Sequence, residues 1–268
     1  MTSRVATKRR RLEPAAVTRP YANPLLKAPR VPRKCIWEIT RRCNLRCIHC
    51  ENRSGPLSAG ELADGRLLEV AEELADLGCH EAVVTGGEPL LRPAWKIVCR
   101  ALSQRGIDVS LVTNGTLLDP ATLDEARSVG VGVVGISIDG LRATHDRIRP
   151  REARGRSPWE QTVDALARCA KALPVVAMTQ VNRLNLDELP DLGRLLAELG
   201  VQRWQVQLCI PMGRVRDLPG PFAIEPEHLE PLVAFLRQAV LQGFEDGEAA
   251  MAGIEHANHR FSRLHPQK

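Results

Sequence analysis

Short runs of β-branched and other apolar residues alternate with longer segments of helical period along most of this chain. Six runs are expected to be strands: 35–40, 81–87, 108–115, 132–140, 174–182 and 203–209. The segments between them open on Pro, Ser or Asp and close on Gly, as helices do. Repeated βα units of this kind give a parallel sheet. Because a complete TIM barrel has eight units, the sequence predicts an α/β fold, a partial (β/α)6 TIM-type barrel.

The charge distribution divides the chain into three parts. Residues 1–34 carry ten Lys and Arg against one Glu, although the net charge of the whole chain is only +5. We interpret this segment as a basic, disordered and solvated arm, with contact to an acidic partner or nucleic acid as the alternative. Residues 35–215 are the predicted barrel core, and residues 216–268 a C-terminal helical extension and tail. An aromatic content of 3% disfavours base stacking, so nucleic acid is not an expected partner of the core.

The eight cysteines are unevenly distributed along the chain. No run approaches the roughly 18 apolar residues of a membrane span, and no apolar segment follows the N-terminal charges, so we predict a cytoplasmic protein without a membrane partner. Cytoplasmic cysteines are more often metal ligands, catalytic thiols or packing residues than disulfide partners. Cys43, Cys47 and Cys50 fall within eight residues, whereas packing is the expected role of the others: Cys35, Cys79, Cys99, Cys169 and Cys209.

The C-x3-C-x2-C spacing of the three clustered cysteines indicates a metal centre. Three thiolates from one loop can ligate three irons of a [4Fe–4S] cluster and leave the fourth iron open to another ligand. A structural zinc site is the alternative, but zinc requires a fourth protein ligand. His49 or a distant residue would have to supply it, and the position of His49 next to Cys50 makes it awkward for both to reach one ion. The spacing therefore favours the cluster.

Polar and Gly-rich residues follow several predicted strands, at the edge where parallel α/β sheets bind ligands. In TGGEP, Gly86 and Gly87 would let the backbone approach a ligand closely. Ser137 ends a hydrophobic strand at the same edge, which favours a ligand contact. Turn chemistry is the alternative interpretation of TGGEP and of the Asp-Gly in SIDG, and it applies equally to Thr113 and Asn114.

These motifs together resemble the radical SAM enzymes. CNLRCIHC is similar to the three-cysteine motif of that family, and GGEPL follows the second predicted strand as its GGEP-type turn does. VTNGTLL and ISIDGLRATHDRIR resemble the branch with SPASM or twitch domains, which includes peptide maturases. The resemblance covers residues 35–215 and departs from its commonest form at His49, where many members have an aromatic residue. No cysteine follows Cys209, so the auxiliary-cluster domain of that branch is expected to be lacking.

The resemblance implies an enzyme with two cofactors, a [4Fe–4S] cluster and S-adenosylmethionine (SAM). Cys43, Cys47 and Cys50 would hold the cluster and serve catalysis. An electron from a flavodoxin- or ferredoxin-type donor would cleave SAM to a 5′-deoxyadenosyl radical, which abstracts hydrogen from a substrate. The SAM-binding residues that the resemblance implies are Gly86, Gly87, Glu88, Pro89, Thr113, Asn114, Ser137, Asp139, Arg149 and Asn182.

Some of these residues have a more specific expected role. Glu88 would accept hydrogen bonds from the SAM ammonium, and Arg149 would hold the SAM carboxylate. His145 and Asp146 are interpreted as a network at a helix entry rather than as catalysts. Gln180 and Gln207 alternate with apolar neighbours, so they are expected to point polar groups into the barrel.

The substrate remains open at this stage. By analogy with the branch, the enzyme would act in the maturation of a ribosomally made peptide. A small-molecule substrate in tetrapyrrole or cofactor biosynthesis is an alternative with the same mechanism. An alternative of another class is a non-catalytic, zinc-stabilised or degenerate scaffold whose basic arm binds a partner.

Overall fold

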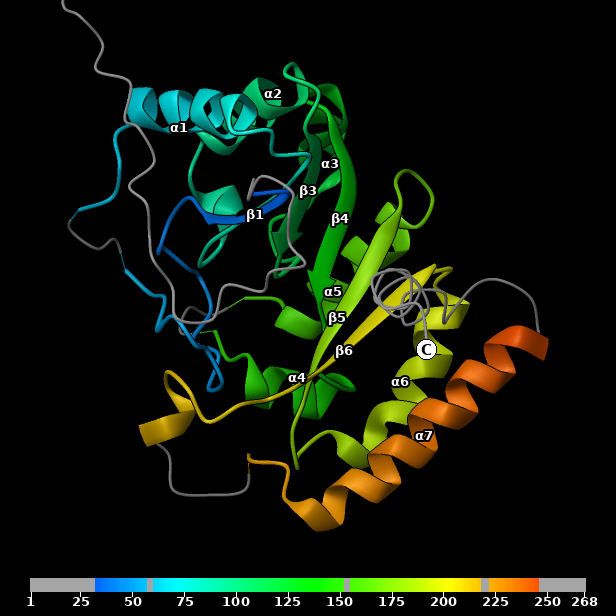
Figure 1. The fold of residues 1–268 in the computed structure, drawn as a ribbon. Helices are drawn as coiled ribbons and strands as arrows, with labels where there is room; N and C mark the ends of the chain where they lie inside the picture. Colours follow the sequence, from blue (N-terminus) through cyan, green and yellow to red (C-terminus); the bar gives the residue numbers. More distant parts are fainter. Residues whose placement is uncertain (1–31, 57–59, 152–154, 218–221, 246–268) are drawn as a thin grey trace, which may run out of the picture. The chain divides into compact units, whose positions relative to one another are not determined.

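The computed structural model describes residues 32–56, 60–151, 155–217 and 222–245 (Figure 1). Its six strands form one sheet in the order β1-β2-β3-β4-β5-β6, with every neighbouring pair parallel. Each connection is therefore a crossover, and the sheet curls into a half-barrel, which confirms the predicted architecture. The strands are Lys34–Glu38 (β1), Glu81–Thr85 (β2), Asp108–Thr113 (β3), Val131–Ser137 (β4), Val175–Val181 (β5) and Arg203–Leu208 (β6).

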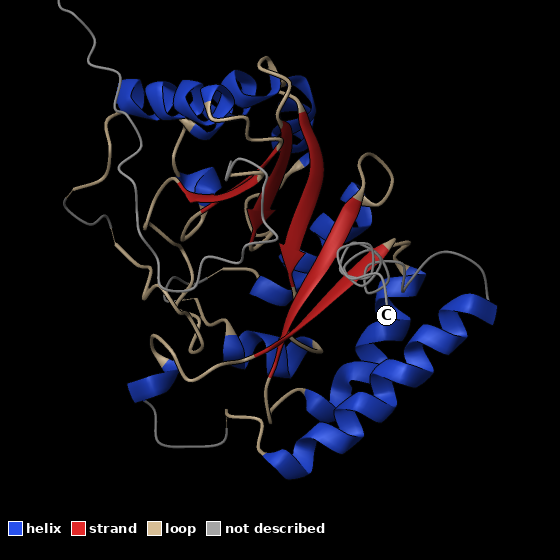
Figure 2. Ribbon diagram, in the orientation of Figure 1, coloured by secondary structure: helices blue, strands red, loops and turns tan. Residues whose placement is uncertain are grey.

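Helices occupy the crossovers and follow the last strand (Figure 2). Their capping residues are of the kind expected at helix starts: Asp119 accepts a hydrogen bond from the Thr122 amide at the start of Pro120–Ser128 (α3), and Ser157 accepts one from the Glu160 amide at the start of Pro158–Cys169 (α5). The α-helices are Asp64–Asp76 (α1), Trp95–Ser103 (α2), Pro120–Ser128 (α3), Arg142–Ile148 (α4), Pro158–Cys169 (α5), Leu189–Glu198 (α6) and Pro226–Glu245 (α7). Short 3-10 helices span Pro89–Leu91, Leu186–Glu188 and Val215–Asp217.

The hydrophobic core lies between the sheet and the helices. Buried and half-buried residues alternate along β2 and β5, so one face of each strand packs and the other is more open. Val84, Leu111 and Ile136 project from neighbouring strands into this core and have no exposed surface. Three isolated cysteines, Cys79, Cys99 and Cys169, are buried in the same core. Their expected role as packing residues is confirmed.

The structure corrects several predicted boundaries. The predicted strands ending at residues 87, 115 and 140 stop at Thr85, Thr113 and Ser137, because the polar and Gly-rich residues beyond leave the ladder. Helix α4 was not predicted as a separate element. His145 and Asp146 lie within it, and the Asp146 carboxylate accepts hydrogen bonds from the Ser157 hydroxyl (2.5 Å) and the Trp159 amide (2.9 Å) at the start of α5.

Parts of the predicted organisation lie outside the described residues. Residues 1–31 of the basic arm and residues 246–268 of the tail belong to this group. Helix α7 lies within the C-terminal extension where a helix was expected. In the ranges that the structure describes, no helix is both long enough and apolar enough to cross a membrane.

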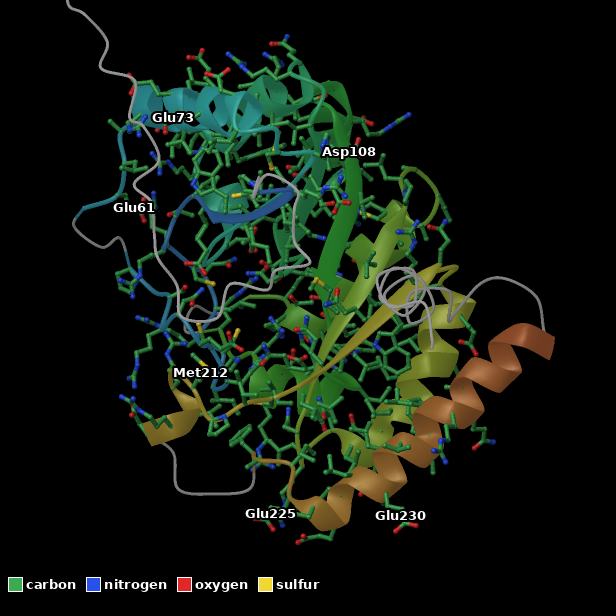
Figure 3. The ribbon with its side chains drawn as sticks, in the orientation of Figure 1. Glu61, Glu73, Asp108, Met212, Glu225 and Glu230 are labelled. Carbon is green, nitrogen blue, oxygen red and sulfur yellow. The ribbon has the colours of Figure 1, made fainter. Side chains whose placement is uncertain are left out.

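The loops that follow β1 and β2 are in direct contact. The Gly87 amide donates to the Thr40 carbonyl and the Glu88 amide to the Arg42 carbonyl, both at 2.7 Å. Glu61, labelled in Figure 3, secures the first of these loops by accepting hydrogen bonds from the Thr40 hydroxyl (2.9 Å) and the Arg41 amide (2.8 Å). The backbone after β1 is thereby fixed against the end of β2.

This contact leaves no room for a side chain at the paired glycines. A Cβ on Gly87 would lie 2.3 Å from the Arg42 carbonyl oxygen. We expect Gly87→Ala to lower the free energy of unfolding by about 1–3 kcal/mol, because backbone must shift to relieve the overlap. Urea unfolding followed by circular dichroism measures this change.

Gly65→Ala is the matched control. Gly65 lies in α1 with open space where a Cβ would be placed, and alanine favours helix more than glycine does. This variant should be as stable as the wild-type protein or more so. If Gly87→Ala were as stable as the wild-type protein, the close contact between the two loops would not be a constraint on the fold.

Candidate active site

Three cysteine thiols line one cavity at the carboxyl-terminal edge of the sheet. Cys43, Cys47 and Cys50 are all unpaired. The predicted ligand segments meet them there, through cavity-lining residues at the ends of β2, β3 and β4 and beyond: Gly86, Gly87, Thr113, Asn114, Ser137 and Arg149. Segments up to about a hundred residues apart in sequence are thus brought together, as the parallel topology requires.

The cysteine loop is held from both sides. The Ile48 amide donates to the carbonyl of Ile148 at the end of α4, at 2.9 Å. From the segment after β6, the Arg214 guanidinium donates to the Cys47 carbonyl at 2.8 Å and the Arg214 amide to the Cys50 carbonyl at 3.1 Å. These bonds fix the backbone of the loop, so the directions of its thiols do not depend on a bound metal alone.

A series of side-chain hydrogen bonds links the same loop to the end of β3. The Asn114 amide group donates to the Asn44 side-chain oxygen at 2.9 Å, and the Asn44 amide group donates to the Thr116 hydroxyl at 2.8 Å. Asn114 also accepts a hydrogen bond from the Thr116 backbone amide at 2.9 Å. The turn chemistry foreseen for the Asn-Gly segment is therefore present, together with a position on the cavity wall.

Each thiol sulfur has one hydrogen-bond donor. The backbone amides of Leu45 and Ser54 lie 3.4 Å from the sulfurs of Cys43 and Cys50. The third sulfur, that of Cys47, has the Arg149 guanidinium at 3.9 Å. Such donors stabilise thiolate, which is the form that binds metal.

Burial opposes ionisation of two of these thiols, Cys47 and Cys43, in the metal-free protein. It raises the pKa of Cys47 to about 12, although the Arg149 charge acts in the opposite direction. The pKa of the Cys43 thiol is raised for the same reason, while its hydrogen bond from the Leu45 amide lowers it. Binding of a metal centre must therefore displace protons from the site.

The separation of the sulfurs does not match a single zinc ion. Tetrahedral zinc with bonds of about 2.3 Å holds its sulfur ligands about 3.8 Å apart. Within the described ranges, the sulfurs of Cys43, Cys47 and Cys50 are not a group whose ligand atoms all lie within 4.8 Å of one another. His49 already lies 3.1 Å from the Asp139 carboxylate through its Nε2 atom. Three thiols from one loop on one cavity wall are the donor set that an iron–sulfur cluster with one open iron requires.

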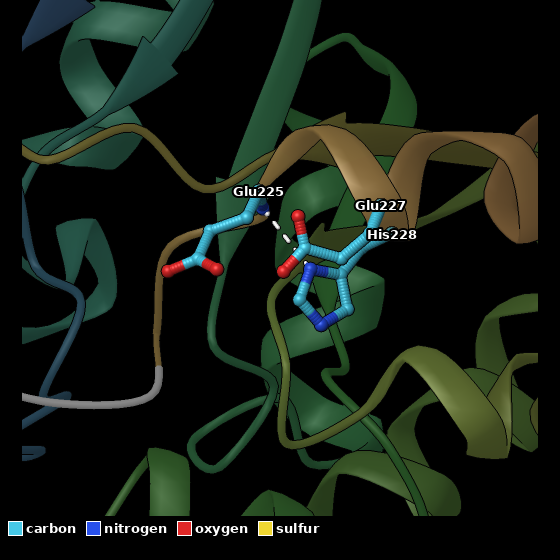
Figure 4. Close-up of side chains that lie close together, drawn as sticks. All are labelled: Glu225, Glu227 and His228. Atoms are coloured by element: carbon cyan, nitrogen blue, oxygen red, sulfur yellow. Dashed lines mark hydrogen bonds between the residues drawn. The ribbon is translucent and has the colours of Figure 1, made fainter.

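Another close group of possible metal ligands lies at the start of α7. Glu225, Glu227 and His228 come within the same 4.8 Å limit (Figure 4), but both carboxylates are exposed. The Glu225 amide donates to Nδ1 of His228 at 3.2 Å. We interpret this arrangement as the hydrogen bonding of a helix start, and it provides no evidence for a metal site.

Glu88 lies behind the cavity wall. Its side chain is fully buried and accepts hydrogen bonds from the Thr113 hydroxyl (2.8 Å), the Asn114 amide (2.8 Å) and the Leu90 amide (3.1 Å). Burial raises the pKa of Glu88 to about 7 even though these bonds lower it. In this structure the carboxyl group positions Thr113, which ends β3, and Asn114, which follows it.

Asp139 is also buried and does not line the cavity. Its Oδ2 atom lies 2.6 Å from Nε of Arg149 and 3.1 Å from Nε2 of His49, and its Oδ1 atom accepts the Gln180 amide at 2.9 Å. Burial alone would raise the pKa of Asp139, but Arg149 and then His49 outweigh it and hold the pKa below its ordinary value. The group is a carboxylate in an ion pair.

The other two predicted contacts lie away from the cavity lining. Pro89 is buried in the 3-10 helix after β2. Asn182 is fully buried and caps a turn, accepting the Leu184 amide at 2.9 Å and donating to the Gln180 carbonyl at 3.1 Å. Their expected contacts with SAM remain predictions.

Several cavity residues were not expected as ligand contacts. Thr85 and Glu51 line the cavity, as does His49, which had been weighed only as a zinc ligand. Thr85 directly precedes the paired glycines, so its place at a strand end was a usable signal. Gln180 lines the cavity as expected for a residue pointing into the barrel, whereas Gln207 is exposed and outside the lining.

The raised pKa of Glu88 predicts a specific pH dependence of stability. The folded protein holds a proton on Glu88 up to about pH 7, whereas the ordinary pKa of a glutamate is 4.5. The contribution of this proton to the free energy of unfolding is fully present below pH 4.5 and is lost as the pH rises through about 7. We expect the wild-type protein to lose stability over this range relative to Glu88→Gln, which does not titrate. Urea unfolding at several pH values measures the difference.

Glu230→Gln is the control, since Glu230 is exposed on α7. Its stability should follow that of the wild-type protein at every pH. If the profile of Glu88→Gln also ran parallel to that of the wild type, Glu88 would not be a proton-binding group in the folded state.

Comparison with known proteins identifies the family. A family model described as the radical SAM superfamily matches residues 37–196. An AdoMet-dependent heme synthase of Methanosarcina barkeri is 36% identical over 186 residues, which cover 68% of this chain and 52% of that protein. The mycofactocin maturase MftC of Mycobacterium tuberculosis is 30% identical over 186 residues, covering 68% of this chain and 46% of that protein. The chain thus spans about half the length of these relatives.

Solved structures share the fold. Native anSMEcpe with bound AdoMet and the Kp18Cys peptide matches with a TM-score of 0.69 at 19% identity, covering 82% of this chain and 63% of the other. Streptococcus suis SuiB bound to its precursor peptide SuiA gives a TM-score of 0.67 at 14% identity, covering 82% of this chain and 48% of the other. With the family model matching more than half of its residues, the chain belongs to the radical SAM superfamily, whose members are enzymes that use a [4Fe–4S] cluster and SAM.

Proposed function

We propose that this chain cleaves SAM reductively and uses the product to remove a hydrogen atom from a substrate. The observation that carries this proposal is the set of three unpaired thiols, Cys43, Cys47 and Cys50, on the wall of a cavity bounded by Gly86 and Gly87. A cluster held by three cysteines leaves one iron for SAM. Bound together, the cluster and SAM supply a 5′-deoxyadenosyl radical, with the electron coming from a flavodoxin- or ferredoxin-type donor.

The protein's own residues would bind and orient the cofactor. The glycines at 86 and 87 present bare backbone, which lets a ligand approach closely. Thr113, Asn114 and Ser137 offer polar groups on the adjoining wall. In this proposal Glu88 and Pro89 act by fixing that wall, and Asn182 by fixing the turn after β5, since none of the three lines the cavity.

A peptide is the first substrate class that we propose. Support comes from relatives such as the sporulation killing factor maturation protein SkfB of Bacillus subtilis, which is 27% identical over 210 residues. MftC is a further relative of this kind. The half-barrel suits such a substrate because β1 and β6 are edge strands that do not pair with each other within the described ranges. A long peptide can therefore approach the cavity.

A tetrapyrrole is the second substrate class. The heme synthase of Methanosarcina barkeri at 36% identity favours it, as does the Fe-coproporphyrin III synthase of the same organism at 28%. A binding measurement distinguishes the two substrate classes. A tetrapyrrole enzyme should change the visible absorption of added Fe-coproporphyrin III, and a peptide enzyme should not.

The central proposal predicts the outcome of anaerobic reconstitution with iron and sulfide. The protein should gain about four irons per chain and, after reduction with dithionite, form 5′-deoxyadenosine from SAM. Replacement of Cys43, Cys47 and Cys50 together by Ala should abolish both, because the cluster loses every protein ligand. Iron analysis and chromatography of the nucleoside product measure the two effects.

Cys35→Ala is the control for loss of a thiol, since Cys35 lies on β1 and packs against the hydrophobic core. It should retain both iron and nucleoside formation. A colourless protein that binds zinc and leaves SAM intact would contradict the enzyme proposal and favour the zinc-stabilised scaffold.

A further inference from the structure

The Arg149 guanidinium is surrounded by polar groups of the protein itself. Its Nε atom lies 2.6 Å from Oδ2 of Asp139, and its Nη2 atom lies 3.3 Å from Nε2 of His49. The remaining nitrogen, Nη1, is 3.9 Å from the Cys47 sulfur. The side chain is 11% exposed. Its position is therefore set by three partners, one of which is a thiol of the metal centre.

This contact distinguishes Cys47 from the two other clustered cysteines. Cys43 and Cys50 each face a neutral backbone amide, from Leu45 and Ser54. Cys47 faces a cationic side chain. A hydrogen bond from a charged donor is roughly twice as strong as one from a neutral donor, so the three sulfurs lie in unequal electrostatic surroundings.

The Asp139 carboxylate fixes the orientation of the guanidinium. Asp139 has no exposed surface and is held in turn by the Gln180 amide, 2.9 Å from its Oδ1 atom. Because a charge buried without its partner is strongly destabilising, the Asp139–Arg149 pair cannot separate easily. Nη1 is left directed at Cys47, and the Nε side of the guanidinium is already occupied.

The reduction potential of an iron–sulfur cluster depends on nearby charge and on hydrogen bonds to its sulfurs. Reduction adds negative charge, which a neighbouring cation stabilises more than it stabilises the oxidised cluster. A guanidinium at a ligand sulfur therefore makes the cluster easier to reduce. Loss of the guanidinium should move the potential to more negative values.

We infer that Arg149, positioned by Asp139, donates a hydrogen bond to the Cys47 sulfur of the bound cluster and raises its reduction potential. This inference rests on the proposed function, because it requires the cluster. It gives Arg149 a different role from the hold on the SAM carboxylate that the family resemblance suggests. The two roles have different experimental consequences, since one concerns the potential and the other the affinity for SAM.

The experiment compares Arg149→Gln and Arg149→Lys with the wild-type protein, each reconstituted anaerobically in full length. The midpoint potential of the cluster is measured without SAM by redox titration followed by electron paramagnetic resonance. Iron content and SAM affinity are measured on the same samples. We expect the midpoint potential to be highest in the wild-type protein, lower in Arg149→Lys and lowest in Arg149→Gln. Lysine keeps the charge but cannot span both Asp139 and Cys47.

Arg147→Gln is the matched control. Arg147 lies in the last turn of α4, two residues before Arg149, and is exposed. Its loss removes the same charge from the surface, where solvent and salt screen it, so the potential should not change. Iron content in all variants should remain that of the wild-type protein.

Three results would overturn the inference. An unchanged potential with weakened SAM binding would assign Arg149 to the SAM carboxylate. Loss of iron from both Arg149 variants while the fold persists in circular dichroism would mean that the residue assembles the site rather than tuning it. A wild-type protein that binds no cluster would overturn the proposed function together with this inference, whereas the first two results leave the proposed function intact.

Discussion

The buried Asp139 carboxylate connects more of the site than any other single group described above. It follows β4, accepts the backbone amide of Gln180 on β5, pairs with Arg149 after α4 and contacts His49 in the cysteine loop. An ionised carboxylate without these partners could not remain in the interior, since desolvation costs several kcal/mol. The Asp139–Arg149 ion pair is therefore one of the contacts that position the cysteine loop relative to the sheet, and it determines the charge that faces Cys47.

The course of the strands could be predicted because it depends on local sequence. Apolar runs of period two and helix caps such as Asp119 act within a few residues. The strand ends could not be predicted as well. The stop at Thr85 follows from contact of Gly86 and Gly87 with the carbonyls of the loop after β1, some forty residues earlier. Helix α4 has only seven residues, too few for a clear period, and its link to α5 through Asp146 is not visible in sequence.

The candidate site shows the same division between local and distant information. The three cysteines were recognisable because one short loop contains all of them, and the strand-end segments because parallel strands end at one edge. Sequence could not show which polar side chains turn inward. Glu88 is directed away from the cavity by the Asn114 amide, 26 residues away, and Asp139 is held by Gln180, 41 residues away. Such partners are fixed only by the fold.

The open face of the sheet bears on the choice of substrate. Gln180 lines the cavity, and its partner in the neighbouring strand is Gln207, which is exposed, as is Gln205 beside Met178. Amide side chains both donate and accept hydrogen bonds but carry no charge, so these three glutamines favour neither of the two proposed substrate classes. Selection between the two substrate classes must then come from groups other than these glutamines.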